Sequence, residues 1–435
     1  MKMRFNKQNV RKANKGITLI ALIVTIIVLL ILAGVSIAVS KGENGILEQA
    51  KSAKTVTEEE DEKEKIELEV LKSYKKNGNL DVTKLKRNIE NNLDDVDEVT
   101  LSDSENKFPV TVKYENGNEY TIKNNGDVKK ALPTITAGQT APSNSNAIYE
   151  DGDYTVIVPA GFTVSDKTGE SSVETGVVIK DGGNNEFVWI PVGIAKKSGS
   201  GTIELGRYDF NSNGTPSAYS GSNAEEDSTN TSALLNYGNT IAKNINDFIE
   251  KTNEAGGFYI GRYEARTTSS TTARSDKTDP LTAVTENASN MIYNYITQPD
   301  AATKARTMYA TNNYFECDLV NSYAWDTATL FLQEYDDRAI KPKVYSIQNS
   351  IVFEINEKGT NNPKDSSKVD KICNVYDMAS NCYEFSTETN SDSDKSVIHR
   401  GGFCYVSDFH TCTRGTFNTT ACDDYVSFRP ILYVK

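Results

Sequence analysis

The chain has 435 residues, a formal net charge of −13 and only two histidines. Its length predicts roughly two to four domains. The excess of acidic residues excludes most nucleic-acid binders, because those proteins need a basic face to displace counterions from phosphates. The shortage of histidine argues against most metal, proton-shuttle and triad sites. Six cysteines are too few for a disulfide-based fold.

The N-terminal region predicts a membrane anchor. Residues 1–16 carry basic side chains and no acid, and residues 17–39 carry no charge. As a helix, the apolar stretch would be about 35 Å long, enough for a bilayer core of roughly 30 Å. The basic flank predicts that residues 1–16 stay in the cytoplasm, so we expect a single-pass protein of the cell membrane with an extracellular C-terminal domain. A signal peptide is the alternative, because residues 36–40 contain small-x-small triplets.

The junction KGITLI at residues 15–20 resembles the leader of type IV prepilins. The resemblance implies a prepilin peptidase that cuts between Gly16 and Ile17, after a basic leader over 1–16 and before a transmembrane helix over 17–40. It also implies other pilins as partners and a pilus-associated location. The family usually has glutamate at the fifth mature position, where this chain has Ala21. This departure argues against assembly into a filament shaft and leaves a tip or minor pilin, or a lone anchored protein.

Residues 41–130 predict a helical stalk followed by a small α/β spacer. The sequence TEEE at 57–60 fits a capping box, and apolar residues then recur every four positions. Residues 81–93 predict a second short helix. Two alternating stretches, 110–114 and 120–122, flank the turn ENGN and predict a β-hairpin. Residues 131–150 predict a linker, because prolines and small polar residues follow one another there without periodicity.

Residues 151–435 predict a loop-rich domain outside the cell. Short β-rich pieces at 154–158, 177–179, 187–190 and 258–260 are separated by the polar stretches 194–236 and 266–282, which predict surface loops. Helices are expected within 233–253 and at 322–334. With the N-terminal helix and the spacer, the predicted fold class is α+β.

Several segments of residues 180–435 resemble, in the same order, the formylglycine-generating-enzyme and sulfatase-modifying-factor family. They are FVWIPV (187–192), GFYIGRYE (257–264), NVYDMASNCYEF (374–385), HRGG (399–402) and SFRPIL (427–432). The resemblance implies a C-type-lectin-like domain. From the residue types, we expect the aromatic side chains of these segments in the core and their charged side chains in buried ion pairs. The charged residues are Arg262, Glu264, Glu384, Arg400 and Arg429.

Catalytic members of this family bind copper through two cysteines that lie shortly after the double glycine. Here Cys404 and Cys412 follow Gly402, but their spacing differs from the family's pattern. We therefore predict no catalytic residue, no metal ligand and no cofactor, and leave a structural calcium ion open. A copper-dependent oxidase that uses Cys404 and Cys412 remains the enzymatic alternative.

The stretch 403–427, FCYVSDFHTCTRGTFNTTACDDYVS, contains no Lys, Glu, Gln, Met or Trp. We call it the 403–427 window. By composition, chance absence of these five types is on the order of one in a hundred. Codons that end in a pyrimidine encode none of the five, and replacing both adenines of an Asn codon produces such codons. Between RGG at 400–402 and FRP at 428–430, this pattern resembles the variable region of proteins diversified by retroelements.

The resemblance implies a binding function, so we predict a surface-displayed adhesin or receptor with an unknown protein or glycan ligand on another surface. Aromatic side chains of the window offer large, rigid contact area, and its polar side chains offer adaptable hydrogen bonds. An accidental surface-loop composition and a minor pilin that only caps a filament are the alternatives. The predicted ligand-binding residues are Phe403, Cys404, Tyr405, Ser407, Asp408, Phe409, His410, Thr411, Phe417, Asn418, Asp423, Asp424 and Tyr425.

Overall fold

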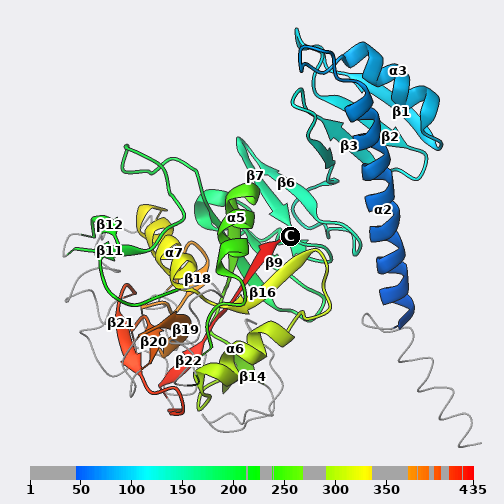
Figure 1. The fold of residues 1–435 in the computed structure, drawn as a ribbon. Helices are drawn as coiled ribbons and strands as arrows, with labels where there is room; N and C mark the ends of the chain where they lie inside the picture. Colours follow the sequence, from blue (N-terminus) through cyan, green and yellow to red (C-terminus); the bar gives the residue numbers. More distant parts are fainter. Residues whose placement is uncertain are drawn as a thin grey trace, which may run out of the picture. The chain divides into compact units, whose positions relative to one another are not determined.

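The computed structural model describes residues 46–211, 214–225, 238, 240–267, 291–335, 371–379, 381–390, 396–402, 411–423 and 425–435. The chain divides into two compact units, Met1–Ala131 and Leu132–Lys435 (Figure 1). The described residues form 23 strands and five α-helices. The described part of the chain is therefore mainly β-sheet.

Unit 1 pairs two helices with a four-stranded antiparallel sheet of strand order β1-β2-β3-β4. Ile66 and Leu85, one from each helix, pack with the sheet residues Val110 and Val112 in one core. The predicted hairpin is confirmed as β2 paired with β3. The elements are α2 (Ile46–Lys72), α3 (Val82–Asn92), β1 (Val96–Leu101), β2 (Val110–Tyr114), β3 (Glu119–Ile122) and β4 (Val128–Lys130).

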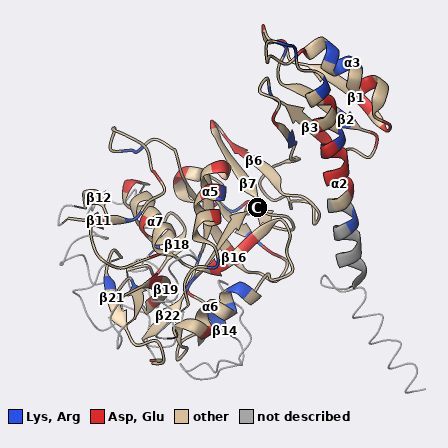
Figure 2. Ribbon diagram, viewed as in Figure 1, with Lys and Arg blue, Asp and Glu red and all other residues tan. Residues whose placement is uncertain are grey.

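Helix α2 is rich in charged side chains, most of them acidic (Figure 2). The capping-box prediction is wrong, because α2 begins at Ile46 and continues through residues 57–60. Exposed pairs such as Lys65 with Asp61, 2.6 Å apart, follow the i,i+4 spacing that makes side chains neighbours on a helix surface. Glu62 is buried instead, and its carboxylate accepts hydrogen bonds from the Asn116 amide and the Tyr120 hydroxyl at 2.7 and 2.9 Å.

A six-stranded antiparallel sheet of order β16-β23-β13-β10-β9-β8 forms the centre of unit 2. Alternate residues of β10 enter different cores, because side chains along a strand point to opposite faces. Val188 packs with helices α5 and α7, and Trp189 packs with α6. All six residues of β10 are buried as a result. The bounds are β8 (Thr163–Val164), β9 (Val178–Lys180), β10 (Glu186–Pro191), β13 (Gly257–Gly261), β16 (Phe315–Leu319), β23 (Pro430–Val434), α5 (Ile245–Ala255), α6 (Gln298–Thr307) and α7 (Ser322–Tyr335).

The region 131–150 is not the predicted linker. It contributes β5 (Thr134–Ile135) and the start of β6 (Ala147–Asp151), which form a sheet with β7 (Tyr154–Val158). Ile135 and Ala147 are buried in the core that holds Trp189. Because prolines and polar residues separate these two short strands, the sequence shows no strand periodicity there. Unit 2 begins at Leu132, so these residues belong to it.

A second sheet, of order β21-β20-β19-β22, carries the C-terminal part of the 403–427 window. Strands β19 and β22 run parallel, and the other neighbours run antiparallel. Its strands are β19 (Tyr383–Thr389), β20 (Val397–Arg400), β21 (Arg414–Phe417) and β22 (Val426–Phe428). Smaller elements are η1 (Val173–Thr175) and the pairs β11 (Tyr208–Phe210) with β12 (Pro216–Ala218), β14 (Arg266–Thr267) with β15 (Met291–Ile292), and β17 (Lys371–Ile372) with β18 (Val375–Tyr376).

Two predictions about class and location need correction. The α+β class with a transmembrane helix is wrong for this structure, because many short strands outnumber the few helices. Among the described helices, none combines the length and the apolar character that crossing a membrane requires; α2 is long but highly charged. This finding also contradicts the predicted single-pass membrane location, with its extracellular domain and pilus association. The leader 1–16, residues 17–40 and the processing residues Gly16 and Ile17 lie outside the described residues.

Candidate ligand-binding face

The structure places five of the predicted ligand-binding residues around the sheet of β19 to β22. Asn418 is exposed, and Phe417, Asp423 and Tyr425 are partly buried. Thr411 is fully buried, so we remove its side chain from the candidate contact surface. The remaining predicted residues lie outside the described part of the chain: Phe403, Cys404, Tyr405, Ser407, Asp408, Phe409, His410 and Asp424.

Two of the predicted contact aromatics lie against the same cluster of rings. The Phe417 ring is 5.7 Å from Phe385 and 6.1 Å from His399 between centroids. The Tyr425 ring is 6.2 Å from Tyr383 and 6.4 Å from Phe417. The inner rings of this cluster are buried, whereas Phe417 and Tyr425 form its partly exposed rim.

The backbone that carries these side chains is held by hydrogen bonds. The Asn418 side-chain oxygen accepts bonds from the amide and the hydroxyl of Thr420, both at 2.8 Å. The Tyr383 amide donates to the Tyr425 carbonyl at 2.9 Å, and the Tyr295 amide donates to the Asp423 carbonyl at 3.0 Å. Asn418 thus closes a local turn with Thr420, and residues outside the window hold the backbone at Asp423 and Tyr425, while the Asn418 side chain stays exposed.

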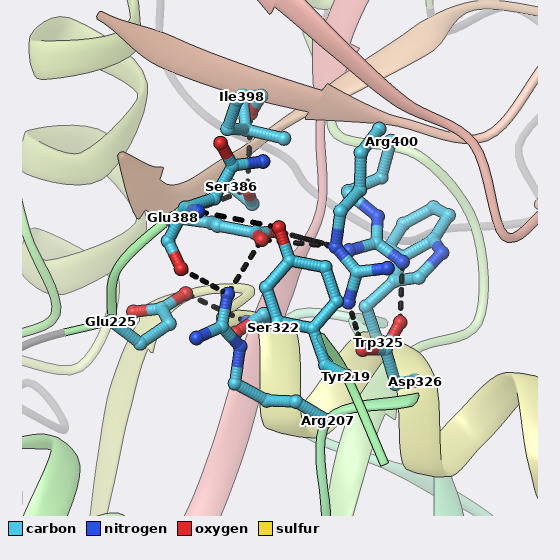
Figure 3. Close-up of polar contacts among 12 residues, drawn as sticks. Arg207, Tyr219, Glu225, Ser322, Trp325, Asp326, Ser386, Glu388, Ile398 and Arg400 are labelled. Carbon is cyan, nitrogen blue, oxygen red and sulfur yellow. Dashed lines mark hydrogen bonds and ion pairs between the residues drawn. The ribbon is translucent and has the colours of Figure 1, made fainter. Parts of the chain in front are cut away.

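Beneath β20 and β21 lies a buried network of arginines and carboxylates (Figure 3). Glu388 accepts hydrogen bonds from Arg207 at 2.7 Å, Arg400 at 2.9 Å and Arg414 at 2.9 Å. Asp326, on α7, pairs with Arg400 and Arg414. Both carboxylates have fully buried side chains. Burial alone would raise the pKa of Glu388, but the three arginines hold that pKa below its usual range.

This network also fixes the window itself. Arg414, the first residue of β21, donates to Glu388 and Asp326 and also to the Tyr208 carbonyl at 3.1 Å. The indole nitrogen of Trp325, the neighbour of Asp326 on α7, donates to the Thr411 carbonyl at 2.7 Å. A guanidinium that bonds several acceptors at once provides geometric specificity as well as energy. The start of β21 is therefore held by side chains from α7 and β19.

Most of the predicted buried ion pairs are confirmed. Arg429 pairs with Glu384 at 2.6 Å, and both side chains are fully buried. Arg262 pairs with Glu170 at 2.7 Å and with Glu186 at 2.9 Å. Arg400 pairs with Asp326 and Glu388. Glu264 has a different environment, since its carboxylate accepts hydrogen bonds from the Asn381 amide group and from the Cys382 backbone N–H.

Sequence reasoning missed the acidic partners of this network and the residues that cover it. Asp326 carries a usable signal, because it is the one acidic residue in the otherwise apolar or small-residue stretch 322–332. Arg207, Tyr219 and Glu225 lie in a Ser- and Asn-rich stretch that predicts only loops. Their contacts with Glu388, Ser322 and Arg414 reach residues more than 90 positions away in the chain. Local periodicity in the sequence cannot predict such contacts.

The cysteines of the window give the copper alternative no support among the described residues. Burial raises the pKa of the Cys412 thiol, whereas a metal ligand must be a thiolate. Within the described ranges, no group of three His, Cys, Asp or Glu side chains is arranged to hold a metal ion. Cys404 lies outside those ranges.

Gly415 provides the space in which His399 packs. A Cβ atom at position 415 would lie 2.2 Å from the imidazole Cε1, which is far inside van der Waals contact. We expect Gly415→Ala to destabilise unit 2 by about 1–3 kcal/mol through overpacking. Urea unfolding followed by tryptophan fluorescence measures this change, because both tryptophans, Trp189 and Trp325, belong to unit 2.

A double-mutant cycle separates this contact from a general effect on β21. The His399→Ala/Gly415→Ala pair should be less destabilised than the sum of the two single variants, because removing the ring relieves the overlap. Thr416→Ala, on the same strand, serves as the control and should show no coupling to His399. Additive losses at positions 399 and 415 would contradict the proposed contact.

No family model matches the chain, and no curated protein matches it either. Two solved structures show partial similarity. Treponema denticola variable protein 1 is 11% identical, with a TM-score of 0.31 over 57% of this chain and 96% of that chain. The structure titled "Crystal Structure of CarF" is 14% identical, with a TM-score of 0.26 over 34% of this chain and 70% of that chain. Similarities of this size do not establish a shared fold or function.

Proposed function

We propose that this protein binds a ligand through the 403–427 window and that the window differs between otherwise identical chains. One structural observation carries the proposal. The buried side of the window is tied to residues outside it, through Arg414 to Glu388 and through the Thr411 carbonyl to Trp325. Its other side presents the exposed Asn418 and the partly exposed Phe417. A frame of this kind permits exchange of the outer side chains without loss of the core.

Composition and motif order support the same proposal. The 403–427 window contains only residue types that codons ending in a pyrimidine encode. It also lies between segments that resemble a C-type-lectin-like scaffold, RGG at 400–402 and FRP at 428–430. Rigid aromatic rings next to short polar side chains suit protein or glycan surfaces, because they combine contact area with adaptable hydrogen bonds.

The direct test is to sequence this gene and its surroundings in many cells of one population. We expect codons 403–427 to vary, and a nearby near-copy to differ from them only where it carries adenines. Codons 374–385, which encode another part of unit 2, serve as the control and should be invariant. An invariant 403–427 window without such a copy would overturn the proposal.

A protein-level experiment tests the binding half of the proposal. Exchanging residues 403–427 for the window of another allele should change which glycans or proteins the full chain captures on an array. The melting temperature should move by no more than a few degrees, because Arg414 and its partners are retained. An unchanged capture profile would count against ligand binding through this window.

A further inference from the structure

The hairpin of β11 and β12 contacts Arg414 at the start of β21, although Arg414 and Tyr208 are 206 positions apart in the chain. Arg414 in β21 donates to the Tyr208 carbonyl at 3.1 Å. Arg207, next to it, donates to Glu388 at 2.7 Å and to the Asn223 carbonyl at 2.8 Å. The hairpin thus shares the acidic partner of the window's own arginine.

Tyr219 completes this contact. Its ring centroid lies 4.1 Å from the Arg414 guanidinium carbon and 4.4 Å from that of Arg207. Its backbone N–H donates to the Arg207 carbonyl at 2.9 Å. Figure 3 shows the Tyr219 ring in the middle of the network, beside Arg207 and Glu388. A ring at this distance from a guanidinium is attracted by a cation–π interaction, which is stronger where water is partly excluded.

Arg414 is a poor candidate for variation even though it lies inside the window. Its Nε donates to Glu388, its Nη2 to Asp326 and its Nη1 to Tyr208, so three different groups require the guanidinium geometry. Lysine offers a single charged nitrogen and cannot reproduce that pattern. Any uncharged residue would leave Asp326 and Glu388 buried with one cation fewer.

We infer that Tyr219 is a positioning residue for the binding face: its ring holds Arg414, and Arg414 sets the place of the strand that ends at Phe417. Arg414 is then a fixed position within the diversified window, an assignment that rests on the proposed function. Tyr219 itself lies outside the window and is constant between chains. The binding face would therefore keep the same residues at its β11–β12 edge in every chain, while the exposed side chains of the window differ between chains.

Amide hydrogen exchange tests, without any ligand, whether the Tyr219 ring holds Arg414 and the strand β21 in place. In the full chain, Tyr219→Leu should speed amide exchange over residues 411–420 roughly tenfold, as expected for the loss of the partly buried cation–π contacts with Arg414 and Arg207. Tyr219→Phe keeps the ring and should restore the parental rate. Residues 110–122 of unit 1 provide an internal reference that should not change. Tyr219→Met, which keeps volume without a ring, is the second variant if leucine prevents folding.

A separate readout follows the contact residue itself. A fluorinated phenylalanine at position 417 should give one ¹⁹F resonance in the parent and in Tyr219→Phe, and a broadened or divided resonance in Tyr219→Leu. Uniform acceleration of exchange across unit 2, or identical behaviour of the leucine and phenylalanine variants, would overturn the positioning role. Because neither readout uses a ligand, its failure is distinguishable from a failure of the proposed function. Free variation of residue 414 among sequences from one population would also overturn the inference that Tyr219 positions β21 through Arg414.

Discussion

Replacement of Arg400 by methionine should lower the free energy of unfolding of unit 2 by about 3–5 kcal/mol. The Arg400 side chain is fully buried and neutralises two fully buried carboxylates, Asp326 and Glu388. Methionine fills much of the volume but leaves both carboxylates short of a cation and of hydrogen bonds. Urea unfolding of the full chain, followed by tryptophan fluorescence, reports on unit 2 alone, because Trp189 and Trp325 both lie there.

Lys251→Met is the matched control for this experiment. It also removes a paired cation, but the Lys251 and Glu254 side chains are 29% and 50% exposed. Pairs exposed to water contribute about 0–1 kcal/mol, so the midpoint should barely move. If Arg400→Met lowers the free energy of unfolding no more than the control does, the buried network does not stabilise the fold.

Glu225→Gln should remove part of the pH dependence of the free energy of unfolding. Burial, helped by the nearby Glu388 carboxylate, raises the pKa of the Glu225 carboxyl from 4.5 to about 8. The folded protein thus holds this proton more tightly than the unfolded chain, and its stabilising effect is complete below pH 4.5. That contribution falls as the pH rises from about 4.5 to 8, by a few kcal/mol over the full interval. Glutamine does not titrate, so the free energy of unfolding of the variant should increase relative to that of the parent as the pH rises.

The contacts of Glu225 make glutamine a conservative test. One carboxyl oxygen, Oε1, accepts hydrogen bonds from both the Ser322 amide at 2.7 Å and the Thr387 hydroxyl at 3.1 Å, and a single amide oxygen can accept both. Unfolding free energies are compared at pH 5 and pH 8.5. Glu250→Gln, on an exposed side chain of α5, should run parallel to the parent. Parallel curves for Glu225→Gln as well would contradict the raised pKa.

A second titration acts in the opposite direction and must be separated from the first. Burial lowers the pKa of His399 from 6.5 to about 4, and the neighbouring Arg400 adds to the effect. The neutral imidazole favours the fold above pH 6.5, and this contribution is lost as the pH falls towards 4. The parent therefore loses stability at both ends of the range. Comparing Glu225→Gln with the parent at each pH cancels the His399 contribution.

Local sequence signals identified many of the elements. The β-rich piece predicted at 154–158 has the bounds of β7, and the helix predicted at 322–334 matches α7 almost residue for residue. Gly401 has φ +80, and a Cβ atom there would lie only 2.6 Å from the Met378 carbonyl, so the first glycine of the HRGG motif permits a close backbone approach. These features depend on neighbours in the chain, or on one residue's own conformational freedom.

Other features depended on distant partners and were not predictable. The motifs indicated that Arg400 and Arg429 would be buried in ion pairs, but not that Asp326 would supply a carboxylate from α7. Strands β11 and β12 have three residues each, in a Ser- and Asn-rich stretch, and are held by contacts with Arg414 and Asp326. Short strands of this kind carry too few residues for periodicity to register.

The position of β23 has a consequence for how such a gene can vary. This strand follows the 403–427 window in the chain and lies between β16 and β13, in the interior of the six-stranded sheet. A chain terminated within the window would lack both β22 and β23, and β16 would lose its connection to β13. Codons that end in a pyrimidine include no stop codon. If adenine replacement at Asn codons diversifies the window, it changes side chains while translation always continues into β23, the strand that joins β16 to the rest of the sheet.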